Sequence, residues 1–339
     1  MTYQDRIYGK IKIREPLILE LIKSQTLQRL KGIDQAGYLP LYLKVHSLSA
    51  DSRLVTFVKI TRFEHSLGTF ILLKKFNAII EERVAGLIHD VSHTVFSHTI
   101  DYVVSNGSGR TQNYQDSILE RFVKKSEIPR ILKKYRIGLG YILNKDNFPL
   151  LEKELPDLCA DRIDYSLRTA LGCKMINRGG VKYFLDNLSI EKNSWIFKNY
   201  QSAKRYAKLF LKLNTIYYAG FPTVVMFKTV GDLLKYALKK GHIKKDDLFT
   251  TDKEVMAKIK KRLNADKTLK VLFDRIEGKV KFQNNPKDYN ARAFCKSRVV
   301  DPLFKTNKKV KRLSEIDKNW RKIVREESKP KEYFLKFGA

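Results

Sequence analysis

Four of the six histidines in this 339-residue sequence lie in one short stretch: His65, His89, His93 and His98. A carboxylate stands next to one of them, because Asp90 directly follows His89. Imidazole is the commonest metal ligand in proteins, and its pKa lies near neutrality. A local cluster of histidines with an adjacent carboxylate therefore predicts a metal site or a site of acid–base chemistry.

Three motifs surround these histidines. The first is Arg62-Phe63-Glu64-His65-Ser66, the second is His89-Asp90 after the apolar run 84–88, and the third is Asp161-Arg162-Ile163-Asp164-Tyr165. Together they resemble the HD-domain phosphohydrolase family. The segment 87–98, Leu-Ile-His-Asp-x-x-His-x-x-Phe-Ser-His, is similar to the triphosphohydrolase branch of that family. The overall pattern resembles its prokaryotic members, and the related dNTPases with SAM and HD domains are more distantly similar.

The resemblance implies a metal site formed by His65, His89, Asp90 and Asp161. A single histidine on an apolar helix is more often a hydrogen-bonded core residue, but the conjunction of the three motifs favours a metal. Two imidazoles and two carboxylates suit Mn²⁺, Fe²⁺ or Mg²⁺, and Zn²⁺ or Ni²⁺ remain alternatives. The expected cofactor is therefore a divalent metal ion.

The resemblance also implies catalytic and substrate-binding residues. Phosphoryl transfer needs positive charge near the phosphate oxygens and a proton for the leaving oxygen. The residues implied for catalysis are His93, His98 and Asp90. Those implied to bind substrate are Arg62, Arg162, Tyr165, Gln35 and Lys228, while Asp164 is expected to be structural. A structural ion pair for Arg62 and a packing role for His98 remain alternatives.

Four departures from the family pattern lie on the nucleotide side. Asn113 stands where the family has a histidine, and Thr169 stands where it has an aspartate. The segment 41–60 replaces the family's segment before Arg62, and in 225–228 Val225 stands where the family has an aromatic residue and Phe227 where it has a histidine. Three hypotheses follow. The first is a dNTP triphosphohydrolase that releases deoxynucleoside and triphosphate. The second is a phosphomonoesterase or phosphodiesterase acting on nucleotides or single-stranded nucleic acid. The third is a non-catalytic protein that binds them.

Composition restricts the partners and the setting. The net charge of +31 attracts polyanions, so nucleic acid is a further partner besides a nucleotide substrate, although a solvated lysine-rich surface explains the charge equally well. Three cysteines without paired spacing suit a reducing cytoplasm. No apolar run is long enough for a membrane span, and no signal peptide is expected. The family resemblance implies a homo-oligomer.

Hydrophobic periodicity predicts a mainly α fold, with an HD-domain helical core over 1–239 and a lysine-rich α+β region over 240–339 packed on it. Helices are expected over 16–37, 66–80, 81–90, 115–143, 151–171, 200–240 and 245–275. The alternating residues in 41–60 predict a β-hairpin. Extended segments are expected at the N-terminus and at 195–197, with a small sheet within 279–304. The last thirty residues show little periodicity.

Overall fold

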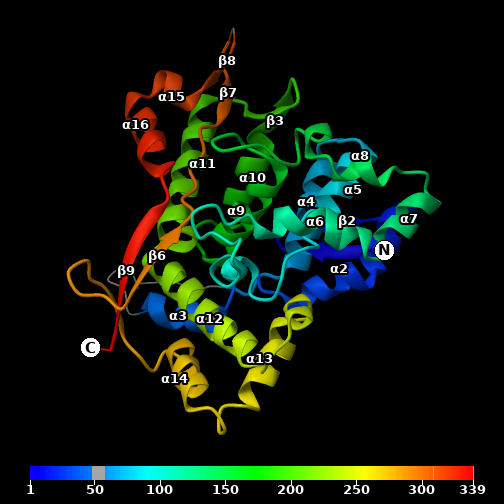
Figure 1. Cartoon of the computed structure of the whole chain (residues 1–339). Coiled ribbons are helices and arrows are strands. Elements are labelled where there is room, and N and C mark those ends of the chain that lie inside the picture. Colours follow the sequence, from blue (N-terminus) through cyan, green and yellow to red (C-terminus); the bar gives the residue numbers. More distant parts are fainter. Residues whose placement is uncertain (48–57, 308, 339) are drawn as a thin grey trace.

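The computed structural model describes residues 1–47, 58–307 and 309–338. It is mainly helical with three small sheets (Figure 1), so the predicted mainly α fold is confirmed. The helices are α1 (Pro16–Lys23), α2 (Gln25–Arg29), α3 (Leu39–Ser47), α4 (Arg62–Lys75), α5 (Ile80–Ile88), α6 (Tyr114–Lys124), α7 (Ile128–Lys134), α8 (Leu139–Leu143), α9 (Ala160–Gly172), α10 (Arg178–Asn187), α11 (Tyr200–Leu213), α12 (Phe221–Lys239), α13 (Asp252–Lys260), α14 (Lys267–Ile276), α15 (Leu313–Ile316) and α16 (Lys318–Glu327).

Helix α4 lies in the larger of two hydrophobic clusters and carries His65. It begins with a capping box, in which the Thr61 hydroxyl accepts the Glu64 amide and the Glu64 carboxylate accepts the Thr61 amide. Eleven of its fourteen residues are buried, and it packs against both α5 and α9. At Gly68 an added Cβ would collide with the side chains of Asp164 and Arg168. Glycine therefore allows the close approach of α9.

Helix α12 organises the second hydrophobic cluster together with α3 and α14. Leu234, before residue 240, and Leu269, after it, are both fully buried in this one cluster. The C-terminal region thus packs directly on α12, while a domain boundary at 240 stays a prediction. Between α11 and α12 the chain makes a π-helical turn, Asn214–Tyr218, a rare form that often occurs at functional sites.

Nine described strands form three sheets. β1 (Thr2–Asp5) pairs with β2 (Gly9–Lys12). The four-stranded sheet has the order β3 (Leu188–Glu191), β4 (Ser194–Phe197), β7 (Leu303–Lys305) and β8 (Val310–Arg312). The third has the order β5 (Phe282–Asn284), β9 (Lys331–Phe337) and β6 (Ala291–Cys295). The extended segment at 195–197 is confirmed as part of β4. The strands expected within 279–304 exist but belong to two different sheets.

The predicted hairpin over 41–60 is wrong where the structure describes it. Residues 39–47 form helix α3, and 48–57 lie outside the described residues. Leu41, Leu43 and Val45 alternate well enough for a strand. Val45 also follows Leu41 by four residues and Tyr42 by three, so the set Leu41, Tyr42 and Val45 fits one face of a helix. All three are buried, and α3 packs on α12. Tertiary packing therefore decided between two patterns that the sequence allows equally.

Other elements also differ from the prediction, and the helix expected over 115–143 is divided into α6, α7 and α8. The segment 16–37 breaks at Ser24, whose hydroxyl accepts the Leu27 amide and caps α2. The helix expected over 151–171 begins only at Ala160. The last thirty residues contain α16 and β9 despite their weak periodicity. Helix α16 has few apolar residues, and Trp320 is its one buried side chain, so the sequence gives little periodicity that would predict this helix.

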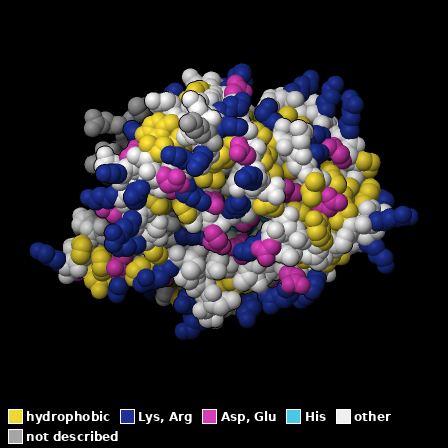
Figure 2. Space-filling view, turned by 90° about the horizontal axis from the view of Figure 1, so that it is seen from above, with side chains coloured by type: hydrophobic (Ala, Val, Ile, Leu, Met, Phe, Trp, Pro, Cys, Tyr) yellow, Lys and Arg dark blue, Asp and Glu magenta, His cyan; other side chains and the backbone are white. Residues whose placement is uncertain are grey.

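Lysine and arginine side chains are scattered over the face in Figure 2, with acidic side chains among them. The positive charge is thus spread over this face rather than gathered in one strip. No helix of the described residues combines the length and the apolar character needed to cross a membrane. The three cysteines are free and buried, as their spacing predicted.

Candidate active site

His65 on α4 is oriented by a buried carboxylate on α9. Its Nδ1 lies 2.8 Å from Asp164 Oδ2, which can only accept, so this nitrogen carries the proton. Asp164 is itself held by a bidentate bond from Arg168 and by the Tyr8 hydroxyl at 2.9 Å. The lone pair of His65 Nε2 therefore faces Asp161 Oδ1, 2.8 Å away. The structural role expected for Asp164 is to fix this imidazole.

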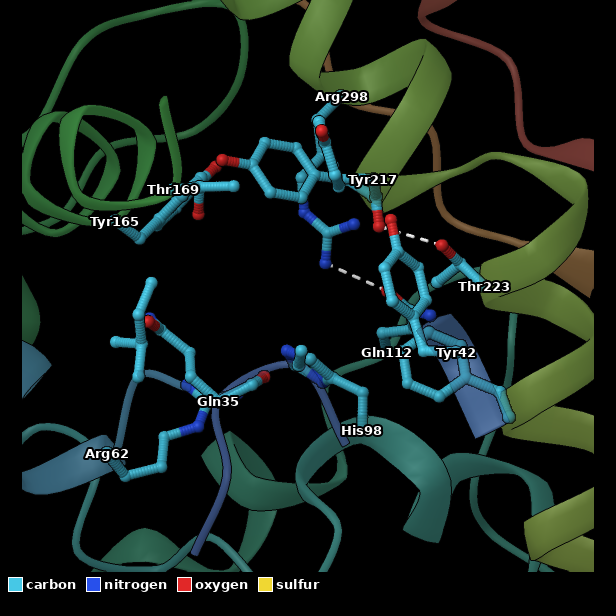
Figure 3. Close-up of a pocket in the computed structure, with 14 residues that line it drawn as sticks. Gln35, Tyr42, Arg62, His98, Gln112, Tyr165, Thr169, Tyr217, Thr223 and Arg298 are labelled. Atoms are coloured by element: carbon cyan, nitrogen blue, oxygen red, sulfur yellow. Dashed lines mark hydrogen bonds between the residues drawn. The ribbon is translucent and has the colours of Figure 1, made fainter. Parts of the chain in front are cut away.

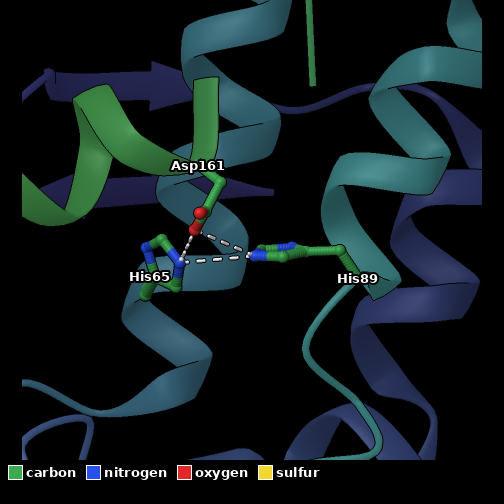
Figure 4. Close-up of side chains that lie close together, drawn as sticks. All are labelled: His65, His89 and Asp161. Carbon is green, nitrogen blue, oxygen red and sulfur yellow. Dashed lines mark hydrogen bonds and ion pairs between the residues drawn. The ribbon is translucent and has the colours of Figure 1, made fainter. Parts of the chain in front are cut away.

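His89 at the end of α5 meets His65 from the opposite side (Figure 4). Its Nδ1 lies 2.8 Å from the Gly86 carbonyl and must donate to it. In the neutral ring its Nε2 then carries the lone pair, only 3.3 Å from His65 Nε2 and 3.4 Å from Asp161 Oδ1. Two nitrogen lone pairs and a carboxylate oxygen that face one another, all within 4.8 Å, repel unless protons or a metal cation lie between them. This donor set fits a divalent metal ion.

Asp90 borders this group of three. Its Oδ2 lies 3.7 Å from His65 Nε2 and its Oδ1 lies 3.5 Å from His89 Nε2, while Arg62 binds Oδ2 at 2.8 Å. Burial raises the pKa of Asp90, but the Arg62 and His89 charges outweigh burial and hold that pKa well below its usual range. Asp90 is ionised and faces both imidazoles, so its role as fourth ligand stays a prediction with supporting geometry. We refer to His65, His89, Asp90 and Asp161 as the metal cluster.

The electrostatics of the metal cluster favour a cation. Burial lowers the pKa of His89, but the Asp90 charge and the bond to Asp161 prevail and raise that pKa to about 10. The same carboxylates raise the pKa of the buried His65. A site that retains protons this strongly has a negative potential, which a metal ion relieves equally well.

His93 and His98 lie beyond the end of α5, on a chain segment that leaves the helix. Their rings meet edge to face, with centroids 5.1 Å apart. Burial and the Arg62 charge lower the pKa of both, to about 3 for His93 and about 4 for His98. Both are neutral at physiological pH. Phe96 and Ser97 have left-handed φ angles of 56° and 51°, an unusual backbone that turns His98 toward the adjoining cavity.

This cavity, which we call the pocket, adjoins the metal cluster through Arg62 (Figure 3). It has a volume of about 100 Å³, enough for several water molecules. Its lining is rich in tyrosine and contains no carboxylate; the residues are Gln35, Ala36, Tyr42, Ile60, Arg62, His98, Gln112, Tyr165, Thr169, Tyr217, Tyr218, Thr223, Phe227 and Arg298. The structure thus brings four sequence-predicted residues together here: Gln35, Arg62, His98 and Tyr165.

Arg162 and Lys228, which the resemblance also implied, are engaged elsewhere. Arg162 donates to the carbonyls of Asp157 and Lys153, at 2.5 and 3.1 Å, and lies 3.7 Å from Glu152. Lys228 forms an ion pair with Asp232 one turn along α12. Neither lines the pocket, so contacts of these two residues with a substrate stay predictions.

The pocket also contains residues that sequence reasoning missed. Tyr217 and Tyr218 come from the π-helical turn, and Gln112 and Arg298 come from loops far apart in sequence. Nothing in the sequence around 298 indicates that the Arg298 guanidinium reaches this cavity. Asn113 is exposed, while its neighbour Gln112 is buried and faces the pocket.

A second group of ligand-type side chains shares Asp161 with the metal cluster. Glu152 and Cys159 can each place a ligand atom within 4.8 Å of it. Burial and the Asp161 charge raise the pKa of Glu152 to about 7. Spacing in the sequence does not reveal this group, because residue 152 lies in a loop.

Known proteins with similar sequences identify the family. The model described as HD domain matches residues 62–167. The uncharacterized protein YdhJ of Bacillus subtilis is 33% identical over 313 residues, which are 92% of this chain and 91% of that protein. The metal-dependent phosphohydrolase cns2 of Cordyceps militaris is 38% identical over 169 residues, 50% of this chain and 44% of that protein. The deoxynucleoside triphosphate triphosphohydrolase SAMHD1 of Gallus gallus is more distant, 27% identical over 43% of this chain and 24% of its own length.

The fold agrees with this assignment. A crystal structure of a phosphohydrolase from Bacteroides thetaiotaomicron superposes with a TM-score of 0.73 over the full length of both chains, at 18% identity. The helical core brings two imidazoles and a carboxylate close enough to hold one metal ion. The chain belongs to the HD-domain metal-dependent phosphohydrolases.

Proposed function

We propose that this enzyme hydrolyses nucleotides, with deoxynucleoside triphosphates as substrates and deoxynucleoside and triphosphate as products. One observation carries the proposal. The pocket beside the metal cluster combines guanidinium groups and a neutral imidazole with tyrosine rings, and its lining has no carboxylate. Cations suit phosphate oxygens, and aromatic walls suit a sugar and a base.

Four pocket residues have roles that their geometry supports. Arg62 is 5% exposed and spans both regions, since it pairs with Asp90 and lines the pocket. It would bind an oxygen of the phosphate that is attacked. His98 is neutral, so it can accept a hydrogen bond at one ring nitrogen and donate one from the other. Tyr165 and Gln35 would lie against the sugar, as Gln35 Oε1 is buried without a hydrogen bond to the described residues.

A bound divalent ion would supply Lewis-acid polarisation of the phosphate and a nucleophile at neutral pH. Its ligands would be His65, His89, Asp161 and Asp90. The residues around it hold the reacting groups in place. Asp164 keeps the His65 Nε2 lone pair turned inward. His93 Nε2 lies 3.2 Å from Asp90 Oδ1 and can steady that carboxylate.

A second candidate is a phosphomonoesterase or phosphodiesterase acting on nucleotides or single-stranded nucleic acid. The exposed Asn113 favours it, because the imidazole that the triphosphohydrolase branch has at this position is absent. Binding of nucleic acid through the basic surface and self-association stay predictions. The scattered charge in Figure 2 gives no preference for a particular groove.

Product analysis separates these functions. The protein would be incubated with each dNTP and Mn²⁺ or Mg²⁺, beside an Asp161→Ala control, and the products separated by anion-exchange chromatography. Metal-dependent tripolyphosphate with deoxynucleoside supports the proposal. Orthophosphate instead indicates phosphomonoesterase cleavage. Intact dNTPs together with shortened oligonucleotides would establish the nuclease alternative.

A further inference from the structure

Arg298 lies just after β6 and turns its guanidinium into the pocket, toward the side on which Gln112 and His98 lie (Figure 3). Its Nη2 donates to Gln112 Oε1 at 2.8 Å, and its Nη1 donates to the Lys296 carbonyl at 3.2 Å. Its backbone amide donates to Asn214 Oδ1 at 2.8 Å. The residue is therefore anchored at both ends, and its guanidinium has little freedom to leave the pocket.

The charge of Arg298 is not neutralised by a neighbour. Among the described residues no carboxylate oxygen lies within 4.0 Å of this guanidinium, whereas Arg62 is paired with Asp90. Gln112 accepts a hydrogen bond but carries no charge. A half-buried guanidinium that faces a cavity without a carboxylate binds an anion favourably, because its donors are already in place.

The same charge acts on His98. Burial and the Arg62 charge lower the pKa of His98, and Arg298 lowers it further. Both guanidinium groups therefore contribute to the potential at one imidazole, on the path from the metal cluster into the pocket. A single phosphate bound by the metal and Arg62 would leave the second cation without an anion.

We propose that Arg298 binds a phosphate group of the substrate other than the one that is attacked, so that nucleotides with a polyphosphate chain are favoured over nucleoside monophosphates. This inference rests on the proposed function. It makes the C-terminal region part of the active site, with Gln112 and Asn214 as positioning residues for Arg298. The specificity-determining contact then comes from a residue more than 200 positions away from the HD motif.

The experiment compares Arg298→Gln, which keeps size but removes charge, with Arg298→Lys, which keeps charge. Arg292→Ala is the matched control, because Arg292 lies on β6, six residues before Arg298, but pairs with Glu332 at the surface. Two quantities would be measured with excess Mg²⁺: kcat and KM for dNTPs and dNMPs, and the calorimetric Kd of inorganic tripolyphosphate. Thermal unfolding confirms that each variant is folded.

For Arg298→Gln we expect KM for dNTPs and Kd for tripolyphosphate to rise about ten- to a hundredfold, because a charge-assisted hydrogen bond is lost. KM for dNMPs and kcat should change little. Arg298→Lys should recover part of the loss, and Arg292→Ala should behave as wild type. Equal rises of KM for dNTPs and dNMPs, or no change in either KM or Kd, would overturn the inference.

The binding measurement keeps the two proposals separate. If wild type hydrolyses no nucleotide but binds tripolyphosphate in a manner that depends on Arg298, the proposed function fails and the anion site stands. If wild type hydrolyses dNTPs and Arg298→Gln leaves KM and Kd unchanged, the proposed function stands and the role of Arg298 is wrong. If Arg298→Gln does not fold, Arg298→Lys decides between the outcomes. A tripolyphosphate Kd of Arg298→Lys less than about tenfold above that of Arg292→Ala supports the role of the charge, and a larger Kd contradicts it.

Discussion

The metal cluster and the pocket share Arg62 but are built in different ways. In the metal cluster each imidazole is fixed by a second partner, Asp164 for His65 and the Gly86 carbonyl for His89. In the pocket, His98 Nδ1 faces the buried Asp101 carboxylate at 3.5 Å, but Gln35 Oε1 is buried without a hydrogen bond from the described residues. The metal cluster is thus preorganised for one small ion, whereas the pocket retains a free polar group that a ligand can satisfy.

The change with the largest expected effect on hydrolysis, Asp161→Ala, should distinguish the metal cluster from the pocket most clearly. Asp161→Ala removes the carboxylate that faces both imidazoles, and we expect hydrolysis to fall about a thousandfold or more, because the metal stabilises charge by several kcal/mol. Bound metal, measured by mass spectrometry, should fall in parallel. Arg298→Gln should keep its metal. Full metal content in Asp161→Ala would show that the ion is held elsewhere.

Gly68→Ala tests whether the orientation of His65 by Asp164 matters for metal binding. The new Cβ would push aside Asp164 and Arg168, and overpacking of this kind costs about 1–3 kcal/mol of stability. Metal affinity should fall as well, because Asp164 orients His65. Gly140 in α8 is the matched control, since a Cβ there meets nothing within 4 Å. Urea unfolding and metal titration would measure both; equal stability of the two variants would contradict the close approach of α4 and α9.

His98 provides a pH test of the pocket. Its pKa is lowered to about 4 in the folded protein, against about 6.5 in an unfolded chain. Between these values the unfolded chain binds more protons, so the free energy of unfolding rises with pH and is lost as pH falls. His98→Gln removes this contribution and should reduce the slope by about 1 kcal/mol per pH unit. Identical slopes in urea unfolding from pH 4.5 to 7.5 would mean that His98 is not buried in its neutral form.

The metal cluster was predictable because its chemistry is local in sequence. His89 and Asp90 are adjacent, and the motif around His65 has a recognisable length. Asp164 was expected only to be structural, and its contact with His65 Nδ1 depends on how α9 packs on α4. The distance between the ligands could not be predicted, since it depends on how α4, α5 and α9 pack.

The pocket was predicted less well, because it joins segments from 35 to 298. Gln112 and Arg298 lie on loops whose course depends on tertiary contacts, and a π-helical turn has no reliable sequence pattern. The prediction of a β-hairpin over 41–60 was wrong for a related reason. Its apolar spacing fits a strand and a helix equally, and only contact with α12 selects the helix.

The smallest expected effect concerns Lys228, which the family resemblance placed with the substrate. In the structure its ammonium group pairs with Asp232, and it does not line the pocket. We expect Lys228→Ala to change KM for dNTPs less than about twofold and stability by about 0.5 kcal/mol, the usual contribution of an i, i+4 pair. Asp232→Ala should match it. A tenfold rise of KM in Lys228→Ala alone would show that Lys228 leaves Asp232 for the substrate, and that the pocket, unlike the metal cluster, rearranges when it binds.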